Sequence, residues 1–247
     1  MMASSASATS REGWAHAFQH DPGLFDAFRA AEDPEQRIVR RLAAHLALGG
    51  RSVLEIGCGT GRTTEQLCTA AGCYVALDAS RVMLAVARRR VDLACAPRWL
   101  IGRAQALPLA SGSVDVVLAT WVLANMRPGG RALALAEIER VTRAAAGAGT
   151  WLVENHWSSE LQELRGLPTD PSGSEIGSLI GEGGFTIVEE IDTEIRFASD
   201  DEAARVLGAL CGPTASTALA SRPRSRVAQR VVILHRPRTD SRPRSRS

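Results

Sequence analysis

The chain has 247 residues, and all 29 of its Lys and Arg positions are arginine, against 27 acidic residues. A chain of this length can bury the core of one complete α/β domain. The first ten residues, MMASSASATS, have neither the basic nor the apolar part of a secretory signal. No apolar run is long enough to cross a bilayer. We therefore expect a cytoplasmic protein with no membrane span.

Basic residues concentrate near the C-terminal end. Residues 221–247 contain nine arginines and a single acidic residue, Asp240, so the preceding part of the chain is acidic overall. The hexapeptide SRPRSR occurs at 221–226 and again at 241–246. Because the second copy has no apolar residue to bury, we predict a disordered arginine-rich tail at 237–247. Nucleic-acid binding is the alternative, but no RNA-binding motif or aromatic stacking platform accompanies the arginines.

The five cysteines lie at positions 58, 68, 73, 95 and 211 and form no C-x-x-C pair. An odd, scattered set of this kind favours a reducing compartment over a disulfide framework. His16 and His20 are spaced like a metal-binding pair but lack further ligands nearby. We expect neither disulfides nor a metal site.

The predicted elements begin with a cap segment at 1–32, ahead of a domain at 33–236. A helix is predicted from Asp33, a residue type favoured at N-caps and followed by a proline, to the Gly49-Gly50 pair. Buried-strand and amphipathic-helix patterns then alternate. The strands are predicted at 52–57, 73–78, 98–103, 114–120 and 150–155, and the helices at 61–71, 81–91 and 131–143.

This alternation predicts an α/β fold whose parallel sheet is covered by helices on both faces. After residue 155 the rhythm changes. Helices are predicted at 174–184 and 201–212, and strands at 185–197 and 226–235. The two late strands predict an antiparallel hairpin at one edge of the sheet.

The stretch VLEIGCGTGR, residues 53–62, carries the first functional signal. Its glycines form G-x-G-x-G, and Arg62 stands where a dinucleotide fingerprint has its third glycine, which disfavours an NAD-linked oxidoreductase. Asp78 ends the second strand, 21 residues after Gly57. A carboxylate there can accept hydrogen bonds from both hydroxyls of a ribose. The alternative is that Asp78 merely caps the following helix.

Four segments in this order resemble the class I S-adenosylmethionine-dependent methyltransferases: VLEIGCGTGR, VALDAS with Met83, AQALPLASGSVDVVLATWVL and EIERV. The likeness is greatest to the small-molecule group called type 11, which includes ubiquinone and menaquinone biosynthesis enzymes, and it covers residues 35–155. It implies a Rossmann-like sheet of seven mostly parallel strands with an antiparallel edge hairpin. It also implies S-adenosylmethionine as the cofactor.

The resemblance assigns cofactor roles along the chain. The methionine end is assigned to the loop, the ribose to the acidic residue after the second strand, and the adenine and its amino group to later residues. In that order the residues are Glu55, Gly57, Cys58, Gly59 and Gly61, then Asp78, then Ala79, Met83, Ala104, Gln105, Ala119 and Thr120. One position departs from the family, because Arg103 stands where an acidic residue usually accepts a hydrogen bond from the adenine amino group.

The acceptor is expected beyond the carboxyl ends of the strands. His156, directly after the fifth strand, is the first candidate general base, with a structural or substrate-binding histidine as the alternative, and His20 is the second candidate. Trp121 and Asn125 are predicted to shape the acceptor pocket. Two aromatic residues of the cap one helical turn apart, Trp14 and Phe18, either line that pocket or pack ordinarily.

The sequence therefore predicts a monomeric or homodimeric enzyme that methylates a small metabolite on oxygen, nitrogen or carbon. Aligning the acceptor can supply about 7–11 kcal/mol of barrier lowering, so a general base is not obligatory. Two alternatives stay open: a protein of the same fold that binds the cofactor but catalyses another step, and a nucleic-acid-binding protein that uses its arginine tail.

Overall fold

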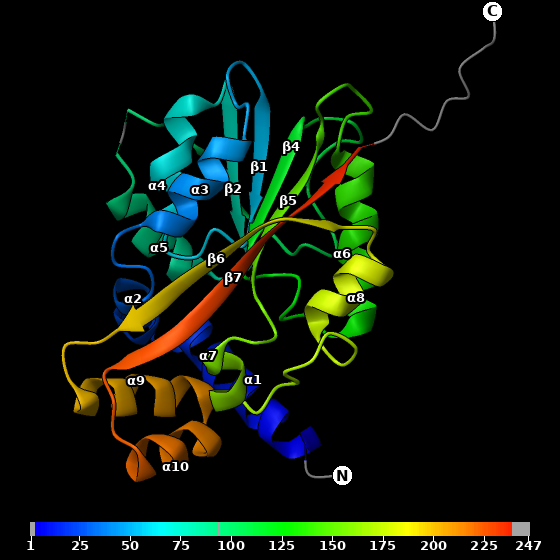
Figure 1. Cartoon of the computed structure of the whole chain (residues 1–247). Helices are drawn as coiled ribbons and strands as arrows, with labels where there is room; N and C mark the ends of the chain where they lie inside the picture. Colours follow the sequence, from blue (N-terminus) through cyan, green and yellow to red (C-terminus); the bar gives the residue numbers. More distant parts are fainter. Residues whose placement is uncertain (1–2, 93, 239–247) are drawn as a thin grey trace, which may run out of the picture.

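The computed structural model describes residues 3–92 and 94–238, with side chains from residue 12 onward. Within these residues seven strands form one sheet, in the order β3-β2-β1-β4-β5-β7-β6 (Figure 1). Their bounds are β1 Ser52–Ile56, β2 Cys73–Asp78, β3 Arg98–Ile101, β4 Val116–Thr120, β5 Gly149–Asn155, β6 Thr186–Arg196 and β7 Arg226–Pro237. The first five run parallel, while β7 pairs antiparallel with both β5 and β6. The predicted Rossmann-like sheet with an antiparallel edge hairpin is confirmed.

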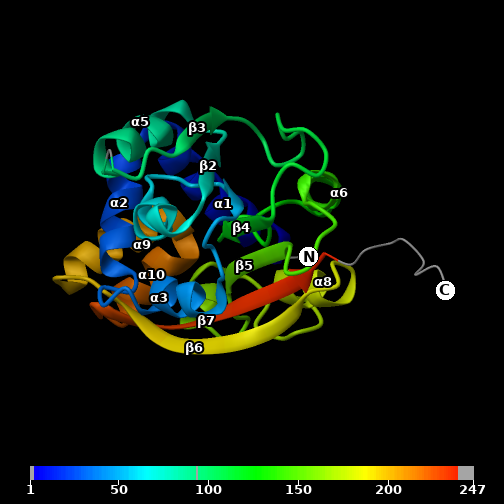
Figure 2. The ribbon, with the colours of Figure 1, turned by 90° about the horizontal axis from the view of Figure 1, so that it is seen from above.

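Helices cover both faces of the sheet (Figure 2). One face carries α3 (Arg37–His45), α4 (Arg62–Leu67) and α5 (Arg81–Arg90). The other carries α6 (Pro128–Val141) and α8 (Glu175–Gly181). Each face has its own apolar cluster, because alternate residues of a buried strand point to opposite faces.

A third apolar cluster lies beyond the carboxyl ends of the parallel strands, at the bottom of Figure 1. It joins five helices that are distant in the sequence, and its buried members include Ala17, Phe28 and Leu210. The helices are α1 (Ala3–His20), α2 (Pro22–Ala31), α7 (Glu160–Leu164), α9 (Asp200–Cys211) and α10 (Pro213–Ser221). The N-terminal segment thereby lies over the edge of the sheet where α/β proteins bind ligands.

The first predicted helix differs in its bounds. It begins at Arg37 rather than Asp33 and ends at His45 rather than at the glycine pair. Asp33 has a positive φ of 51°, outside the helical region, yet its carboxylate still caps the helix from a distance. It accepts the backbone N–H of Arg37 at 2.8 Å and of Ile38 at 2.7 Å. The capping signal was therefore real, but an intervening turn delays the helix.

The expectation that no cysteines pair is wrong for one pair. Cys68 and Cys95 form a disulfide, with Cα atoms 5.6 Å apart. Cys68 begins the short 3-10 helix Cys68–Ala70 after α4, and Cys95 lies in the connection between α5 and β3. The connections that carry the two cysteines follow β1 and β2, which pair in parallel, so the fold brings together two positions 27 residues apart. The spacing of the cysteines alone does not reveal this.

Other expectations meet the structure only in part. Pro237 belongs to β7 and Arg238 pairs with Glu139, while residues 239–247, the rest of the expected tail, lie outside the described residues. In the described residues no helix is long and apolar enough to span a membrane. The same residues contain no group of three or more His, Cys, Asp or Glu side chains arranged to hold a metal ion.

Candidate cofactor and acceptor site

The glycine loop connects β1 to α4 and requires glycine at three positions. Gly57, Gly59 and Gly61 have φ values of 70°, 54° and 86°, in the left-handed region that favours glycine. A Cβ at Gly57 would lie 2.4 Å from Cγ2 of Val122, and one at Gly61 would lie 3.0 Å from Cγ2 of Val91. Glycine at these three positions is thus required by the backbone conformation, and at Gly57 and Gly61 also by close neighbouring side chains.

Asp78 ends β2 beside this loop. Its carboxylate accepts the backbone N–H of Gly59 at 2.8 Å and of Ser80 at 2.7 Å. Burial raises the pKa of Asp78, while these backbone hydrogen bonds oppose the rise. The following helix, α5, is capped by Ser80, whose hydroxyl accepts the N–H of Met83 at 3.2 Å. Asp78 is therefore not the cap of α5 and instead joins the glycine loop to β2.

Glu55 points away from the open side of the loop. Its carboxylate accepts hydrogen bonds from the hydroxyls of Thr64 at 2.5 Å and Tyr74 at 2.9 Å, and the residue is 1% exposed. Burial is the main reason that the pKa of Glu55 is raised to about 7. Its side chain fastens α4 to β1 and β2, which positions the loop from beneath.

The remaining expected cofactor residues lie around the same strand ends with different exposure. Ala79 is exposed, Gln105 and Thr120 are half-buried, and the side chains of Cys58, Met83, Ala104 and Ala119 are buried. The Gln105 amide nitrogen lies 3.8 Å from Sδ of Met126. Arg103 is exposed. These residues therefore surround one edge of the sheet, but several contribute backbone rather than side chain to its surface.

The loop that carries Ala104 and Gln105 is held by α6. The Glu137 carboxylate accepts the backbone N–H of Leu107 at 2.7 Å. Arg140 donates to the carbonyls of Leu107 at 3.0 Å and Leu109 at 2.8 Å. Hydrogen bonding to Arg140 is the main cause that lowers the pKa of Glu137 to about 2, so both partners stay charged at neutral pH.

Trp121 follows β4 in a strained conformation. Its φ is 57°, an outlier for a bulky residue that costs of order 1–3 kcal/mol and is typical of functional sites. The backbone N–H of Trp121 donates to the Val153 carbonyl at 2.7 Å. The Asn125 amide donates to the Trp121 carbonyl at 2.8 Å, and Arg165 donates to the Asn125 oxygen at 2.7 Å. Trp121 and Asn125 therefore belong to one hydrogen-bonded unit at the end of β4.

The aromatic residues of the cap form a cluster above the glycine loop. The Trp14 ring lies 5.9 Å from that of Phe18 and 4.9 Å from that of Phe28, and the Phe18 ring lies 5.3 Å from that of Phe25. A Cβ at Gly59 would lie 3.5 Å from the Phe25 ring. Trp14 and Phe18 thus pack with other aromatic rings, and Phe25, which the sequence analysis did not single out, lies against the loop at Gly59.

A buried charged cluster ties the cap to the loop. Arg62 donates to the carbonyls of Arg29 and Asp33, each at 3.2 Å, and lies 3.7 Å from the Glu32 carboxylate. Arg29 pairs with Glu32, and its guanidinium lies 4.1 Å from the centre of the Trp121 ring. Burial lowers the pKa of Arg29 to about 10. Arg62 stands where a dinucleotide fingerprint has its third glycine, and this replacement is the feature of the sequence that could have indicated the cluster.

The two candidate bases lie in different surroundings. His156 is 4% exposed, and its Nδ1 accepts the backbone N–H of Ser158 at 3.2 Å. The Ser158 hydroxyl oxygen lies 2.7 Å from the same nitrogen, so Ser158 occupies this side of the ring. Burial lowers the pKa of His156, and the charges that act on its ring belong to β6 and β7. His20 is exposed at the end of α1, with its ring 5.3 Å from that of His16.

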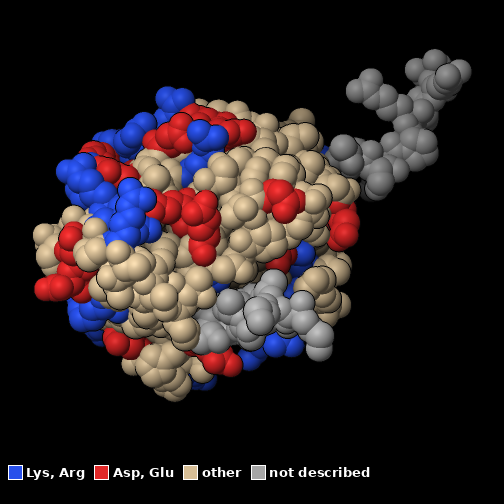
Figure 3. Space-filling view, turned by 60° about the horizontal axis from the view of Figure 1, so that its bottom comes forward, with Lys and Arg blue, Asp and Glu red and all other residues tan. Residues whose placement is uncertain are grey.

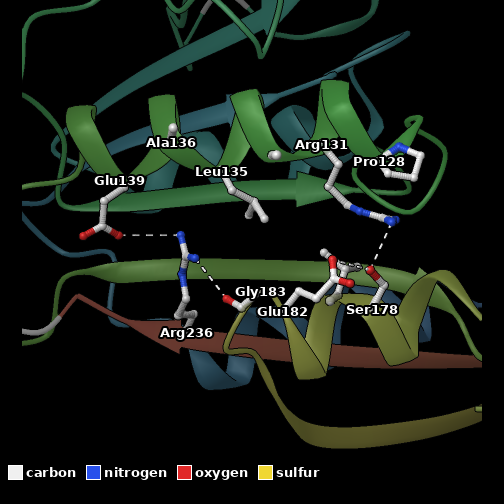
Figure 4. Close-up of a pocket in the computed structure, with 11 residues that line it drawn as sticks. Pro128, Arg131, Leu135, Ala136, Glu139, Ser178, Glu182, Gly183 and Arg236 are labelled. Carbon is white, nitrogen blue, oxygen red and sulfur yellow. Dashed lines mark hydrogen bonds and ion pairs between the residues drawn. The ribbon is translucent and has the colours of Figure 1, made fainter. Parts of the chain in front are cut away.

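A surface groove of about 410 Å³ lies elsewhere, between α6, α8 and β7 (Figure 4). None of its lining residues belongs to the expected cofactor or acceptor set. Its arginines are satisfied by their neighbours: Arg131 donates to Ser178 at 3.2 Å, and Arg236 donates to the Gly183 carbonyl at 3.0 Å. We interpret it as a polar seam between two helices.

Comparison with known proteins identifies the family. Residues 53–145 match a family model described as a methyltransferase domain. An O-methyltransferase of Aspergillus nomiae is 28% identical over 184 residues, covering 70% of this chain and 80% of that protein. A demethylmenaquinone methyltransferase of Renibacterium salmoninarum is 40% identical over 98 residues, 39% of each protein. Residues 53–145 therefore form a methyltransferase domain of the class I S-adenosylmethionine-dependent type.

The methyltransferase fold alone does not fix the reaction, because it carries different chemistries. The solved structure of SpnF, a [4+2]-cyclase, matches this methyltransferase with a TM-score of 0.51 at 19% identity, covering 81% of this chain and 80% of that one. The alignment of this chain with the demethylmenaquinone methyltransferase covers only 39% of that enzyme. The acceptor therefore has to be argued from this chain's own residues.

The cofactor of the methyltransferase is S-adenosylmethionine, and the residues present fit it. The loop has glycine with positive φ at 57 and 59, so its backbone at these positions is not covered by a side chain of its own. An ionised carboxylate has about four acceptor sites. The Asp78 carboxylate, though hydrogen-bonded to Gly59 and Ser80, therefore retains acceptor capacity for ribose hydroxyls.

Proposed function

We propose that this methyltransferase acts on a small-molecule acceptor, on oxygen, nitrogen or carbon. The observation that carries the proposal is the closed aromatic cap, in which Phe25 packs on the glycine loop and Trp14 and Phe18 pack on Phe25. Small-molecule sites are enclosed and lined mainly by apolar and aromatic side chains. The names of two relatives, an O-methyltransferase and a demethylmenaquinone methyltransferase, support the same class of acceptor.

Within this proposal the chain's residues bind and orient. Asp78 accepts the ribose hydroxyls, and the backbone at 57–61 lies along the methionine end of the cofactor. Ala79, Met83, Ala104 and Gln105 surround the adenine, with Ala119 and Thr120 near its amino group. S-adenosylmethionine supplies a methyl group on an already activated sulfonium. The protein therefore acts chiefly by alignment, which can be worth about 7–11 kcal/mol.

We propose alignment, rather than histidine base catalysis, as the main source of rate. The Nδ1 atom of His156 is occupied by the backbone N–H and the hydroxyl of Ser158, and the residue is buried. His20 is exposed and pairs with His16. Trp121 and Asn125, which share a hydrogen bond, form the acceptor wall opposite the cap residues Trp14 and Phe18. Residues 12–32 serve as the cap over both ligands.

The first experiment is calorimetric titration of S-adenosylmethionine into the wild type, Asp78→Ala and Asp192→Ala. Asp192 is the matched control, an exposed β6 carboxylate that pairs with Arg230 at 2.6 Å far along the chain from the loop. We expect binding by the wild type and the control and its loss in Asp78→Ala. Equal binding by all three proteins would refute the role of Asp78. Release of S-adenosylhomocysteine with a panel of small hydroxyl and amine compounds then tests methyl transfer.

The same assays separate the alternatives. A protein of this fold that catalysed a cyclisation would convert its substrate without releasing S-adenosylhomocysteine. A nucleic-acid-binding protein would lose affinity steeply with salt. On the face drawn in Figure 3, basic and acidic side chains lie side by side. Two arginines of the first SRPRSR copy pair with acidic residues. These are Arg224 with Glu160 at 2.7 Å and Arg226 with Glu194 at 3.2 Å. This pairing favours the small-molecule proposal.

A further inference from the structure

The side-chain amide of Gln229, on β7, is buried, and its nitrogen has hydrogen-bond partners whereas its oxygen has none. The residue is 2% exposed. Its Nε2 donates to Oε1 of Glu32 at 2.7 Å and to Oδ1 of Asn155 at 2.8 Å. Both partners are acceptors, so the network fixes which end of the amide is nitrogen. Its Oε1 is buried and has no hydrogen-bond partner.

An unpaired acceptor of this kind is unusual, because folded proteins pair most buried polar atoms. Rotating the amide would not relieve it, since the oxygen would then face two other oxygens. The cost of the unpaired oxygen is compensated only if a donor outside the chain reaches it, such as a ligand hydroxyl, a ligand amine or an ordered water.

The position of Gln229 points to the acceptor. In β7 it lies beyond Val231, the residue that pairs with Asn155 at the carboxyl end of β5. Asn155 in turn accepts the indole N–H of Trp121 at 3.4 Å. Glu32 pairs with Arg29, whose guanidinium covers the Trp121 ring. The unpaired oxygen therefore belongs to the polar network around Trp121.

The cap side of this network carries a second buried atom without a partner. Nε1 of Trp14, a hydrogen-bond donor, has none. The Arg165 guanidinium lies 5.9 Å from the Trp14 ring and donates to Asn125, which is bonded to Trp121. One donor, on Trp14, and one acceptor, on Gln229, are thus left without a partner among the aromatic rings and polar side chains that connect to Trp121.

We propose that Gln229 binds the hydroxyl or amine N–H of the acceptor, which makes the substrate class small aromatic hydroxyl or amino compounds. This inference rests on the proposed function and narrows it to oxygen or nitrogen methylation. An amide does not take up the proton, so Gln229 orients the nucleophile and water receives the proton as the methyl group replaces it. The aryl methyl ether formed from a phenol has no O–H to donate to Gln229, which favours release of the product.

The test compares phenol with anisole, which has the same ring but no O–H. Both are titrated into wild-type protein labelled with 15N at its tryptophan indoles and loaded with S-adenosylhomocysteine. Trp121→Phe assigns the Trp121 signal. We expect a saturable shift of this signal with phenol at an affinity at least about tenfold above that for anisole, because a site built for a hydroxyl rejects the analogue without one. Equal affinities, or no binding of phenol, would overturn the proposal and leave water as the occupant.

Gln229→Met provides the second measurement. It keeps the length of the side chain and removes both the unpaired oxygen and the nitrogen that donates to Glu32 and Asn155. In a variant that still binds S-adenosylhomocysteine, phenol should lose its advantage over anisole. Retention of the tenfold preference in this variant would contradict the role of Gln229. Calorimetry with S-adenosylhomocysteine on both proteins is the independent readout. Failure of that binding in the wild type would count against the proposed function, whereas loss of phenol selectivity alone concerns only Gln229.

Discussion

Replacing Gly57 by alanine tests whether the glycine loop depends on backbone conformation and close approach. With φ at 70°, alanine at this position costs about 1–2 kcal/mol. The new Cβ would meet Cγ2 of Val122 at 2.4 Å, although Cβ of Val122 is 3.7 Å away. Val122 must therefore leave its rotamer, at about 0.5–1.5 kcal/mol. We expect the free energy of unfolding to fall by about 2–3 kcal/mol, with weaker binding of S-adenosylmethionine.

Two other glycines separate these contributions. Gly112 has a φ of 61° and nothing within 4 Å of a built Cβ, so Gly112→Ala reports the conformational cost alone. Gly129, in the first turn of α6, also has open space and no positive φ. We expect Gly129→Ala to leave the free energy of unfolding unchanged or raise it by up to about 1 kcal/mol.

The steric part is checked by combining Gly57→Ala with Val122→Ala. Removing the Cγ atoms of Val122 removes the clash, so the two substitutions should couple favourably by about 1 kcal/mol. Urea denaturation gives the free energies, and calorimetry gives the affinity for S-adenosylmethionine. The reasoning is refuted if Gly57→Ala costs no more than Gly112→Ala, or if Val122→Ala does not lessen its cost.

Three further predictions concern the supports of the site. Glu55, with its pKa raised from 4.5 to about 7, keeps in the folded state a proton that the unfolded chain releases. Stability should therefore fall by about 3 kcal/mol between pH 4.5 and 7 through this group. Glu55→Gln should remove that slope in urea midpoints, and parallel curves would contradict it. Arg62→Ala should speed hydrogen exchange at residues 12–33 while Arg62→Lys has a smaller effect; equal protection in all three proteins would count against the clamp. The Cys68–Cys95 disulfide closes a loop of 27 residues, which restricts the unfolded chain. Its reduction should lower the free energy of unfolding by about 3.5 kcal/mol. Reductant should leave Cys95→Ser unaffected, and an equal response of both would argue against the disulfide.

Local patterns sufficed for the sheet. Buried runs such as 52–56 and 116–120 are long enough to predict a strand and are bounded by helical patterns that cover them. The antiparallel β7 followed from two late strands with little between them. What the patterns did not predict was its place inside the sheet, between β5 and β6, because strand order depends on contacts between distant segments.

The site shows the same division. The glycine loop and Asp78 were predictable because their spacing is local and characteristic. Glu55 was recognised by its position but not by its orientation, which depends on Thr64 and Tyr74. Gln229 gave no signal at all. Its role comes from contacts with Glu32 and Asn155, which lie 197 and 74 residues away in the chain.

Because β7 runs antiparallel to β5, its direction decides from which end of the sheet a label or a surface can be attached to the enzyme. Gln229 lies near the strand ends that carry the site, whereas Pro237 pairs with Gly149, the first residue of β5, at the opposite edge. Eight residues of strand separate the two positions by about 27 Å. A fluorophore, affinity handle or surface linker joined after Arg238 therefore starts from the edge remote from the ligands. The same group joined to α1 would start from the cap, so the C-terminal side is the one to use for immobilising an active enzyme.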